Sequence, residues 1–215
     1  MPVRFALSAT IVLICAALMP SFASATGLAH ARVVDTATGL THARVVDRPV
    51  ARTAVVIDPG GCPTHVPLDA APAVQEQAML CLTNQMRERY GEAPLQPVAQ
   101  LEESAAEKSA DVLSCGLFSH EACGREFTYW IRASGYLDAE CWRVGENLAW
   151  GAGEYGTVES IFHAWMHSET HRENILGDYT QTGIALDVGS LGNLDGVHLW
   201  AQHFGSHCEA PPSLG

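Results

Sequence analysis

The stretch IFHAWMHSETHRENIL, residues 161–176, decides how the rest of the chain is arranged. Ile161 and Trp165 recur at helical spacing, which predicts a helix with one apolar face. Ser168 offers a hydroxyl where this helix should end and a second short turn should begin. We expect His171 to lie at this break, where one polar side chain can point into a cleft.

Two other short stretches each place one ionisable residue among apolar and glycine neighbours. They are FSH, residues 118–120, and GENLAWG, residues 145–151. The ionisable residues are His120 and Glu146. Each lies at an irregular point between packed elements, and such loops often hold functional groups over a rigid scaffold. We therefore expect the side-chain tips of His120, Glu146 and His171 to converge within about 4–6 Å, close enough to interact electrostatically.

Together with AWMxSxxHRxNIL at residues 164–176, these blocks resemble the bacterial secreted branch of the CAP superfamily. That superfamily includes the cysteine-rich secretory proteins, the insect-venom allergens and the plant pathogenesis-related proteins. The resemblance covers residues 72–208, and the blocks occur in family order. It implies an α-β-α sandwich with a small antiparallel sheet between helical layers.

The resemblance also implies a cleft in which His120, Glu146 and His171 are three members of a tetrad of two histidines and two glutamates. At the position of the fourth member this chain has Ser168, and the nearest carboxylate is Glu169. A site with three of the four groups would be more open to solvent than the full tetrad.

Periodicity along the chain independently predicts an α+β domain, because helices come first and a hairpin comes last. The predicted helices cover residues 73–90, 101–115 and 127–133, in addition to the opening stretch. The predicted strands cover residues 182–188 and 197–204, joined as an antiparallel hairpin. We expect Glu146 in a glycine-flanked connection and Lys108 on the solvent side of the second helix. Three tryptophans are expected in the core: Trp150, Trp165 and Trp200.

The chain is expected to have four parts. Residues 1–25 have the pattern of a secretory signal peptide, and residues 26–71 form a linker that is expected to be disordered and contains a 12-residue tandem repeat. Residues 72–208 form the CAP (SCP-like) domain, and residues 209–215 form a tail. No later stretch is long and apolar enough to span a bilayer. The sequence therefore predicts a secreted, extracellular protein.

The net charge of −12 disfavours nucleic acid as a partner, because an acidic surface repels phosphates. Six cysteines follow the predicted signal peptide, and an exported chain with an even count is expected to form disulfides. Six cysteines allow 15 pairings. Their positions along the chain favour the set Cys62–Cys81, Cys123–Cys141 and Cys115–Cys208, the last by elimination.

Two imidazoles and a carboxylate are suitable ligands for a divalent cation such as zinc, with His120 and His171 as the candidate ligands. The same groups could act as acid and base, or form a purely structural polar cluster. His163, His167 and His171 are spaced four residues apart, but the break near Ser168 should take His171 off that helix axis.

Three functions remain open on the sequence. The first is an extracellular binding module with a His/Glu cleft, whose ligand is a divalent metal, a lipid or another small apolar molecule. The second is a secreted, protease-like hydrolase that uses the same cleft, although no nucleophile is convincingly placed. The third is a structural cell-envelope protein with a vestigial cleft.

Overall fold

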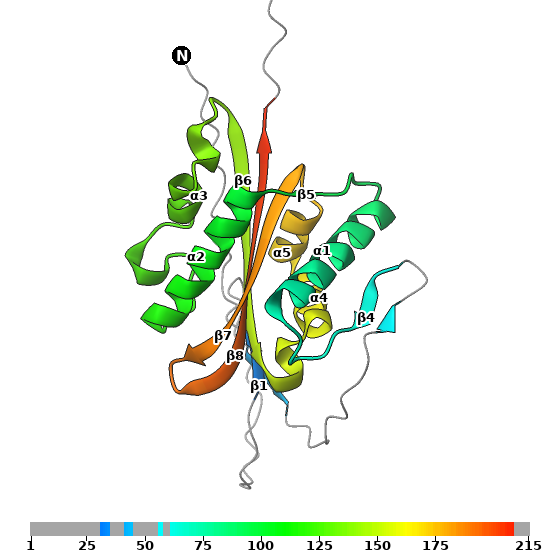
Figure 1. Ribbon diagram of the computed structural model, residues 1–215, viewed down its shortest axis with the longest axis vertical. Coiled ribbons are helices and arrows are strands. Elements are labelled where there is room, and N and C mark those ends of the chain that lie inside the picture. The colour runs from blue at the N-terminus through cyan, green and yellow to red at the C-terminus, as the bar shows by residue number, and fades with distance from the viewer. Residues whose placement is uncertain (1–30, 35–40, 45–55, 58–60, 209–215) are drawn as a thin grey trace, which may run out of the picture.

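The computed structural model describes residues 31–34, 41–44, 56–57 and 61–208 (Figure 1). The helices and helical turns are α1 (Pro72–Arg89), α2 (Ala99–Cys115), η1 (Ala122–Gly124), α3 (Tyr129–Ala133), η2 (Tyr136–Asp138), η3 (Gly153–Gly156), α4 (Val158–His167) and α5 (Glu169–Ile175). The strands are β1 (Ala31–Val34), β2 (Thr41–Arg44), β3 (Val56–Ile57), β4 (Pro63–His65), β5 (Gln96–Pro97), β6 (Trp142–Ala152), β7 (Gln181–Leu191) and β8 (Leu194–His207).

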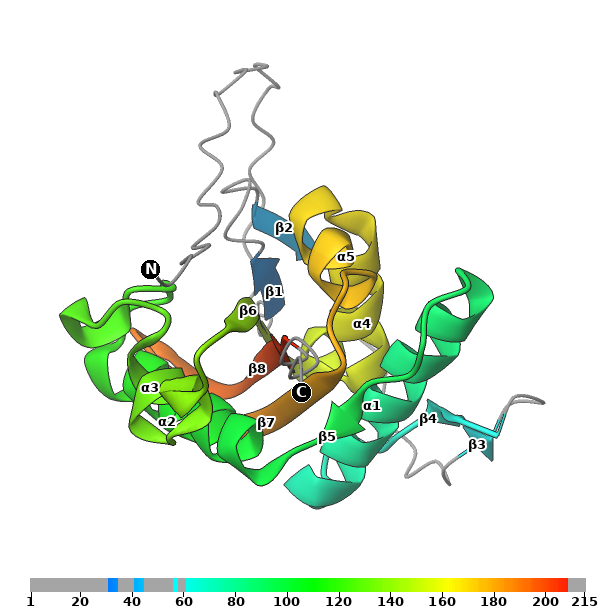
Figure 2. The same ribbon diagram turned by 90° about the horizontal axis from the view of Figure 1, so that it is seen from above.

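The domain is built on a four-stranded sheet in the order β5-β7-β8-β6. Helices α2 and α3 cover one face of this sheet, whereas α1, α4 and α5 cover the other (Figure 2). The expected α-β-α sandwich is therefore confirmed. The sheet is mixed rather than wholly antiparallel, because β5 pairs parallel with the start of β7.

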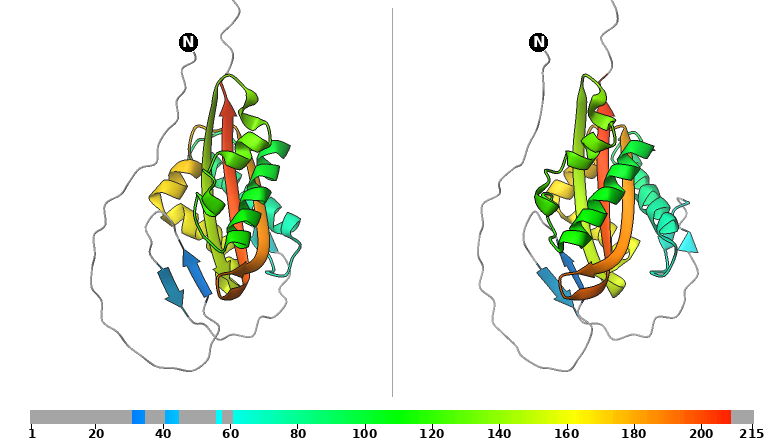
Figure 3. Two further views of the ribbon diagram at one scale, coloured as in Figure 1. Left: turned by 90° about the vertical axis from the view of Figure 1, so that its left-hand side faces the viewer. Right: turned by 60° about the vertical axis from the view of Figure 1, so that its left-hand side comes forward.

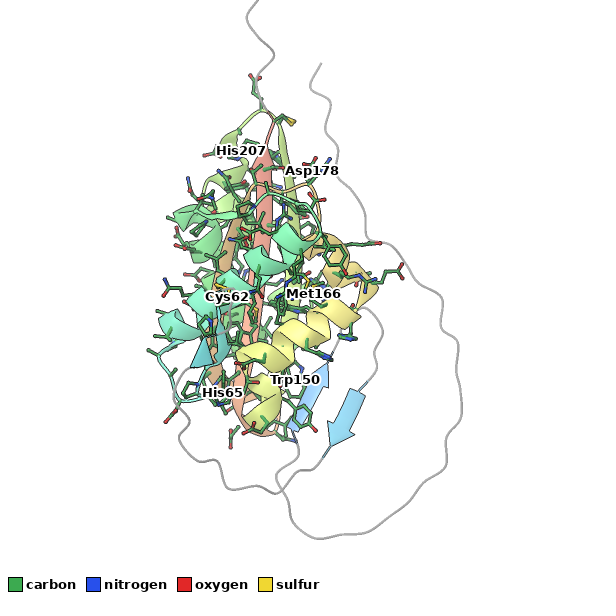
Figure 4. All side chains as sticks on the ribbon, turned by 90° about the vertical axis from the view of Figure 1, so that its right-hand side faces the viewer. Cys62, His65, Trp150, Met166, Asp178 and His207 are labelled. Atoms are coloured by element: carbon green, nitrogen blue, oxygen red, sulfur yellow. A yellow bond between two sulfur atoms is a disulfide. The ribbon has the colours of Figure 1, made fainter. Side chains whose placement is uncertain are left out.

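The longest ladder of the sheet joins β6 to β8, which run side by side along the molecule (Figure 3). Trp150 and His207 mark the two ends of this ribbon (Figure 4). Residues 142–152 were expected to contain a glycine-flanked loop around Glu146, and that expectation was wrong. The strand is buried on both sides over most of its length, so its sequence lacks the alternation that marks a half-exposed strand.

Side chains of β8 supply the centre of the core in both layers. Trp200 and Phe204 pack with residues of α1, α4 and α5, whereas Leu199 and Ala201 pack on the α2 side. All four are fully buried. Complete burial of a large apolar side chain stabilises the fold by about 1.5–3 kcal/mol, so this strand anchors both helical layers. The three tryptophans expected in the core are buried: Trp150, Trp165 and Trp200.

Glycines determine where α2 ends and how closely it packs. The helix ends at Gly116, whose φ of 61° is left-handed and suits glycine. Gly183 of β7 lies beneath the first turn of the helix, and a Cβ atom there would meet the backbone carbon of Leu101 at 2.0 Å. Any side chain at residue 183 would therefore push α2 away from the sheet.

The buried face of α1 is partly polar. The apolar residue Val74 in its first turn is 44% exposed. The helix instead buries Gln75, Ala78, Met79, Thr83 and Arg87. Gln75 and Arg87 are accommodated because their side chains donate hydrogen bonds to carbonyl oxygens of nearby loops.

Short strands occur within residues 26–71, which were expected to be a disordered linker. β1 lies in the first repeat unit and β2 in the second, and they pair antiparallel, with Val34 opposite Thr41. β3 pairs antiparallel with β4. The predicted signal peptide, residues 1–25, and the predicted tail, residues 209–215, lie outside the described residues. Among the helices that are described, none is long and apolar enough to cross a membrane.

Three disulfides link the six cysteines within residues 61–208, and the predicted pairing is correct for one of them. Cys62–Cys81 is confirmed. The predicted pairs Cys123–Cys141 and Cys115–Cys208 are wrong. The bonds are Cys115–Cys123 and Cys141–Cys208.

The physical reason for the different pairing is the β6–β8 ladder. This ladder places Trp142 opposite His207, so the next residues outward, Cys141 and Cys208, are neighbours. The backbone N–H of Cys208 also donates to the carbonyl of Cys141 at 3.2 Å. Cys115 at the end of α2 is then left with Cys123, eight residues further on.

Peptide mapping under non-reducing conditions should recover these three linked pairs from the oxidised protein. The informative peptide joins Cys141 to Cys208, because it links segments 67 residues apart. A peptide that links Cys123 to Cys141 would contradict the β6–β8 register described above. Reduction before digestion provides the control, since it should abolish every linked peptide.

Candidate functional site

Glu146 and His203 are direct cross-strand neighbours in the β6–β8 ladder. Side chains of such a pair project to the same face of the sheet. His203 Nε2 lies 2.8 Å from Glu146 Oε2, and the two side chains are 0% and 1% exposed. The sheet register therefore places a carboxylate and an imidazole in contact inside the protein.

His120 completes the carboxylate's hydrogen bonding from the turn that follows α2. Its Nδ1 lies 2.6 Å from Glu146 Oε1. The His120 side chain is 41% exposed, so it connects the buried carboxylate with the surface. The predicted approach of His120 to Glu146 is thus confirmed.

Two residues of α2, one helical turn apart, support this pair of histidines. Ser104 Oγ lies 2.7 Å from His203 Nδ1. Lys108 Nζ lies 3.8 Å from Glu146 Oε1 and donates a hydrogen bond to the backbone oxygen of His120. Lys108 was expected on the solvent side of its helix, but it is 2% exposed. Burial of Lys108 is possible because its ammonium is paired with the carboxylate of Glu146. The same ammonium helps to hold the His120 turn.

The surroundings of Glu146 keep it ionised. Burial alone would raise its pKa, but hydrogen bonds from His120 and His203 and the charge of Lys108 together lower the pKa to about 2. An ionised carboxylate can only accept hydrogen bonds. His120 Nδ1 and His203 Nε2 must therefore carry the protons, and this assigns the donor nitrogen of each ring.

The order Ser104–His203–Glu146 contains the residue types of a hydrolytic triad. Ser104, however, is completely buried, and its Oγ also lies 3.0 Å from the carbonyl oxygen of Leu101. A nucleophile must meet its substrate, and this hydroxyl is enclosed by α2 and the sheet. Ser119, next to His120, accepts a hydrogen bond from the backbone N–H of Glu121 and so shapes the turn. Neither serine is placed as a nucleophile in this arrangement.

His171 is the third residue of α5 and is 3% exposed, so it lies just beyond the helix break rather than at it. Its backbone oxygen accepts a hydrogen bond from Asn147 Nδ2 at 3.1 Å. Asn174 Nδ2 bonds both to the backbone oxygen of Glu146 and to Asn147 Oδ1. These bonds tie α5 to β6 beside Glu146. The approach of the His171 side chain to the His120–Glu146 pair stays a prediction.

The helix break itself is confirmed at Ser168, whose extended backbone (φ −93°, ψ 126°) separates α4 from α5. Ser168 is buried, and its Oγ lies 3.3 Å from Thr170 Oγ1. Glu169 is exposed in the first turn of α5, where a carboxylate complements the helix dipole. The serine at the fourth tetrad position is thus buried, whereas the nearest carboxylate, Glu169, is at the surface.

The histidines spaced along α4 do not form one cluster with the site. The rings of His163 and His167 stack with centroids 3.9 Å apart, and both residues are exposed. In the described ranges, which run from residue 61 to 208 apart from three short upstream strands, no group of three or more His, Cys, Asp or Glu side chains could hold a metal ion. Both oxygens of Glu146 already accept from histidines, so this carboxylate does not fit a ligand role. A two-histidine zinc site at His120 and His171 stays a prediction.

Sequence reasoning missed three members of the network: Ser104, Lys108 and His203. The polarity of each was visible, but only Lys108 had been assigned to a side of its helix, and that assignment was wrong. Finding His203 requires the β6–β8 register, which pairs it with a residue 57 positions away. A signal available beforehand was that Lys108 is the only lysine of the chain.

Comparisons with known proteins agree with this architecture. The profile of the cysteine-rich secretory protein family, CAP, matches residues 80–204. The uncharacterized protein YkwD of Bacillus subtilis (strain 168) is 32% identical over 130 residues, which is 60% of this chain and 46% of YkwD. The chain thus spans less than half the length of this curated relative.

Two solved structures share the fold at lower sequence identity. An outer surface protein from Borrelia burgdorferi superposes with a TM-score of 0.51 and 18% identity, covering 61% of this chain and 92% of that one. An extracellular protein containing a SCP domain from Bacillus anthracis superposes with a TM-score of 0.50 and 21% identity, covering 62% of this chain and 40% of that one.

Proposed function

Since this chain belongs to the cysteine-rich secretory protein family, CAP, we propose that it acts outside the cell as a binding module whose ligand contacts His120. Export is supported by the signal-peptide pattern of residues 1–25 and by the three disulfides. The Borrelia and Bacillus anthracis proteins of similar fold carry names that place those proteins at the cell surface or outside the cell.

The observation that carries the binding role is the position of His120 at the exposed end of a buried polar network. Its Nδ1 donates to the buried carboxylate of Glu146, which holds the ring in one tautomer and one orientation. The 41% exposure of the side chain makes the ring accessible from solvent. A ligand that reaches this ring would therefore meet a side chain whose orientation is fixed from inside the protein.

Leu117 supports an amphipathic ligand. It lies three residues before His120 and is 53% exposed, so it presents apolar surface to solvent. Phe118, between them, packs edge-to-face on Trp150 and so keeps this segment against the sheet. A small molecule with one polar end and one apolar part would match the two exposed groups.

Native mass spectrometry of protein purified from culture medium would test this proposal. The wild-type protein should retain a bound small molecule, and His120→Ala should reduce its occupancy at least about tenfold, because the only exposed group of the network is removed. His163→Ala is the matched control, since it removes an exposed histidine that does not belong to the network. Equal occupancy in the two variants would contradict the proposal.

The same spectra distinguish the ligand classes. A zinc adduct that is lost in both His120→Ala and His171→Ala would support a two-histidine metal site. Its affinity should be lower in acid, because a protonated imidazole cannot ligate a metal. An organic adduct would support the binding of a small amphipathic molecule. Absence of any adduct from protein recovered directly from its medium would favour the structural cell-envelope role.

The hydrolase alternative requires turnover that depends on the network. It would be supported by a hydrolytic activity that Glu146→Gln abolishes under conditions where the variant remains folded. The burial of Ser104 argues against a serine nucleophile at this site. The binding role therefore has the stronger support.

A further inference from the structure

The sheet has an open edge opposite the edge that carries Glu146. β5 covers only the first two residues of β7, pairing Gln96 with Gln181 and Pro97 with Thr182. β7 then continues to Leu191, and in the described part of the chain no strand pairs with it on this side. β7 is therefore an edge strand from residue 183 onward.

The backbone groups that point out of this edge can be assigned from two hydrogen bonds. Val98 N–H donates to Thr182 O at 3.0 Å, and Leu186 N–H donates to Glu76 Oε1 at 2.9 Å. Even-numbered residues of β7 thus direct their backbone groups outward, because the groups of successive residues alternate between the two sides of a strand. Ile184 N–H, Ile184 C=O and Leu186 C=O belong to this outward set. Among the described residues, none of these three groups has a hydrogen-bond partner on the outer side.

A groove runs along this edge between α1 and α2. Its volume is about 570 Å³, and its floor is residues 182–185. Figure 1 shows β7 between the two helices. Ile184 packs toward α1 and Ala185 packs toward α2. The two helices form the walls of the groove and lie on opposite faces of β7, so the edge of the strand lies between them. Pro97 closes the end of the groove where β5 leaves the sheet.

The walls of the groove are acidic. Glu76 comes from α1, and Glu102 and Glu103 come from α2, whereas none of the lining residues is lysine or arginine. Burial raises the pKa of Glu76, and the charges of Asp187 and Glu102 raise it further. A cationic side chain placed between the walls would offset the repulsion among these carboxylates. The charge of the groove therefore favours a basic occupant.

We propose that this groove binds an extended, basic polypeptide segment, which adds as a strand to the edge of β7 at Ile184 and Leu186. The first residues of the edge already accept an extended segment in this way, since β5 pairs there. Main-chain hydrogen bonds to Ile184 and Leu186 give affinity, and the three glutamates select arginine or lysine at alternate positions of the segment. This site lies on the opposite edge of the sheet from His120 and is independent of the function proposed above.

A short synthetic peptide in which valine and arginine alternate would test the proposal on the full mature protein. Binding is measured by fluorescence anisotropy, and the backbone amides are followed by hydrogen exchange in NMR spectra. Addition of the peptide should slow exchange of the Ile184 amide, because this N–H gains a partner. A peptide of the same sequence with N-methylated amides on its pairing side should not bind, since it cannot form the ladder.

Charge variants test the selection of basic residues. Glu102→Gln combined with Glu103→Gln should weaken binding about fivefold, because two exposed ion pairs are lost. Glu88→Gln is the matched control: Glu88 is exposed near the end of α1 and does not line the groove. An unchanged Ile184 amide, equal binding of the N-methylated peptide, or no binding at all would each overturn the proposal.

Discussion

Glu146→Gln should lower the free energy of unfolding by about 3–5 kcal/mol. The substitution keeps the shape of the side chain but removes the negative charge that faces His203 and Lys108, which are 0% and 2% exposed. It also places an amide N–H₂ where a carboxylate oxygen now accepts a hydrogen bond from an imidazole N–H. Breaking a buried ion pair on one side is costly because the other charge stays buried without a partner. Urea unfolding at neutral pH would measure the loss.

The same variant should differ from the wild type in its response to acid. The pKa of Glu146 falls from its ordinary value of 4.5 to about 2 in the folded protein. A group with a depressed folded-state pKa stabilises the fold above its unfolded-state pKa, and this contribution is lost as the pH falls through the folded-state pKa. The stability difference between wild type and Glu146→Gln should therefore be constant above about pH 4.5 and shrink toward pH 2.

Glu107→Gln provides the matched control for both measurements. Glu107 is an exposed carboxylate on α2, the helix that also carries Lys108. Its loss should change stability by less than about 0.5 kcal/mol, as is usual for an exposed position. If Glu146→Gln were as stable as this control at neutral pH, Glu146 would not be the counter-charge of the buried network.

Arg87→Ala should destabilise the fold by about 3–5 kcal/mol. Arg87 is 1% exposed, and its guanidinium donates to carbonyl oxygens of two loops and of Ile175, the last residue of α5. Nε bonds to Ala93 O at 2.7 Å, Nη1 to Ile175 O and Gly177 O at 2.8 Å each, and Nη2 to Tyr179 O at 3.0 Å. Alanine would leave these oxygens without a donor and open a cavity against the end of α5.

Arg87→Lys should recover only part of this loss. A lysine ammonium carries three donors at one point, whereas the guanidinium presents five in a planar fork that fits several carbonyls at once. Arg89→Ala is the matched control, because Arg89 is exposed in the same last turn of α1 and should tolerate the change within about 0.5 kcal/mol. Thermal unfolding of the three variants would rank them. Equal midpoints for Arg87→Ala and Arg89→Ala would contradict the anchoring role.

Local signals in the sequence were sufficient for features that depend on a few neighbouring residues. Glycine predicted the end of α2 at Gly116, and the hydroxyl at Ser168 predicted the break between α4 and α5. The burial of the tryptophans was predicted from their residue type, and the β7–β8 hairpin from the strand patterns of residues 182–188 and 197–204. The resemblance to the CAP superfamily supplied the α-β-α order of layers and the contact of His120 with Glu146.

Only the tertiary structure decided how distant segments meet. The register of β6 against β8 makes His203 the partner of Glu146 and brings Cys141 to Cys208. The packing of α2 on the sheet buries Lys108, and the two-residue length of β5 leaves the edge of β7 open. Helix ends and apolar faces are encoded by residues a few positions apart. Strand register, disulfide pairing and buried charge pairs depend on residues tens of positions apart, whose contacts become favourable only when the whole sandwich has formed.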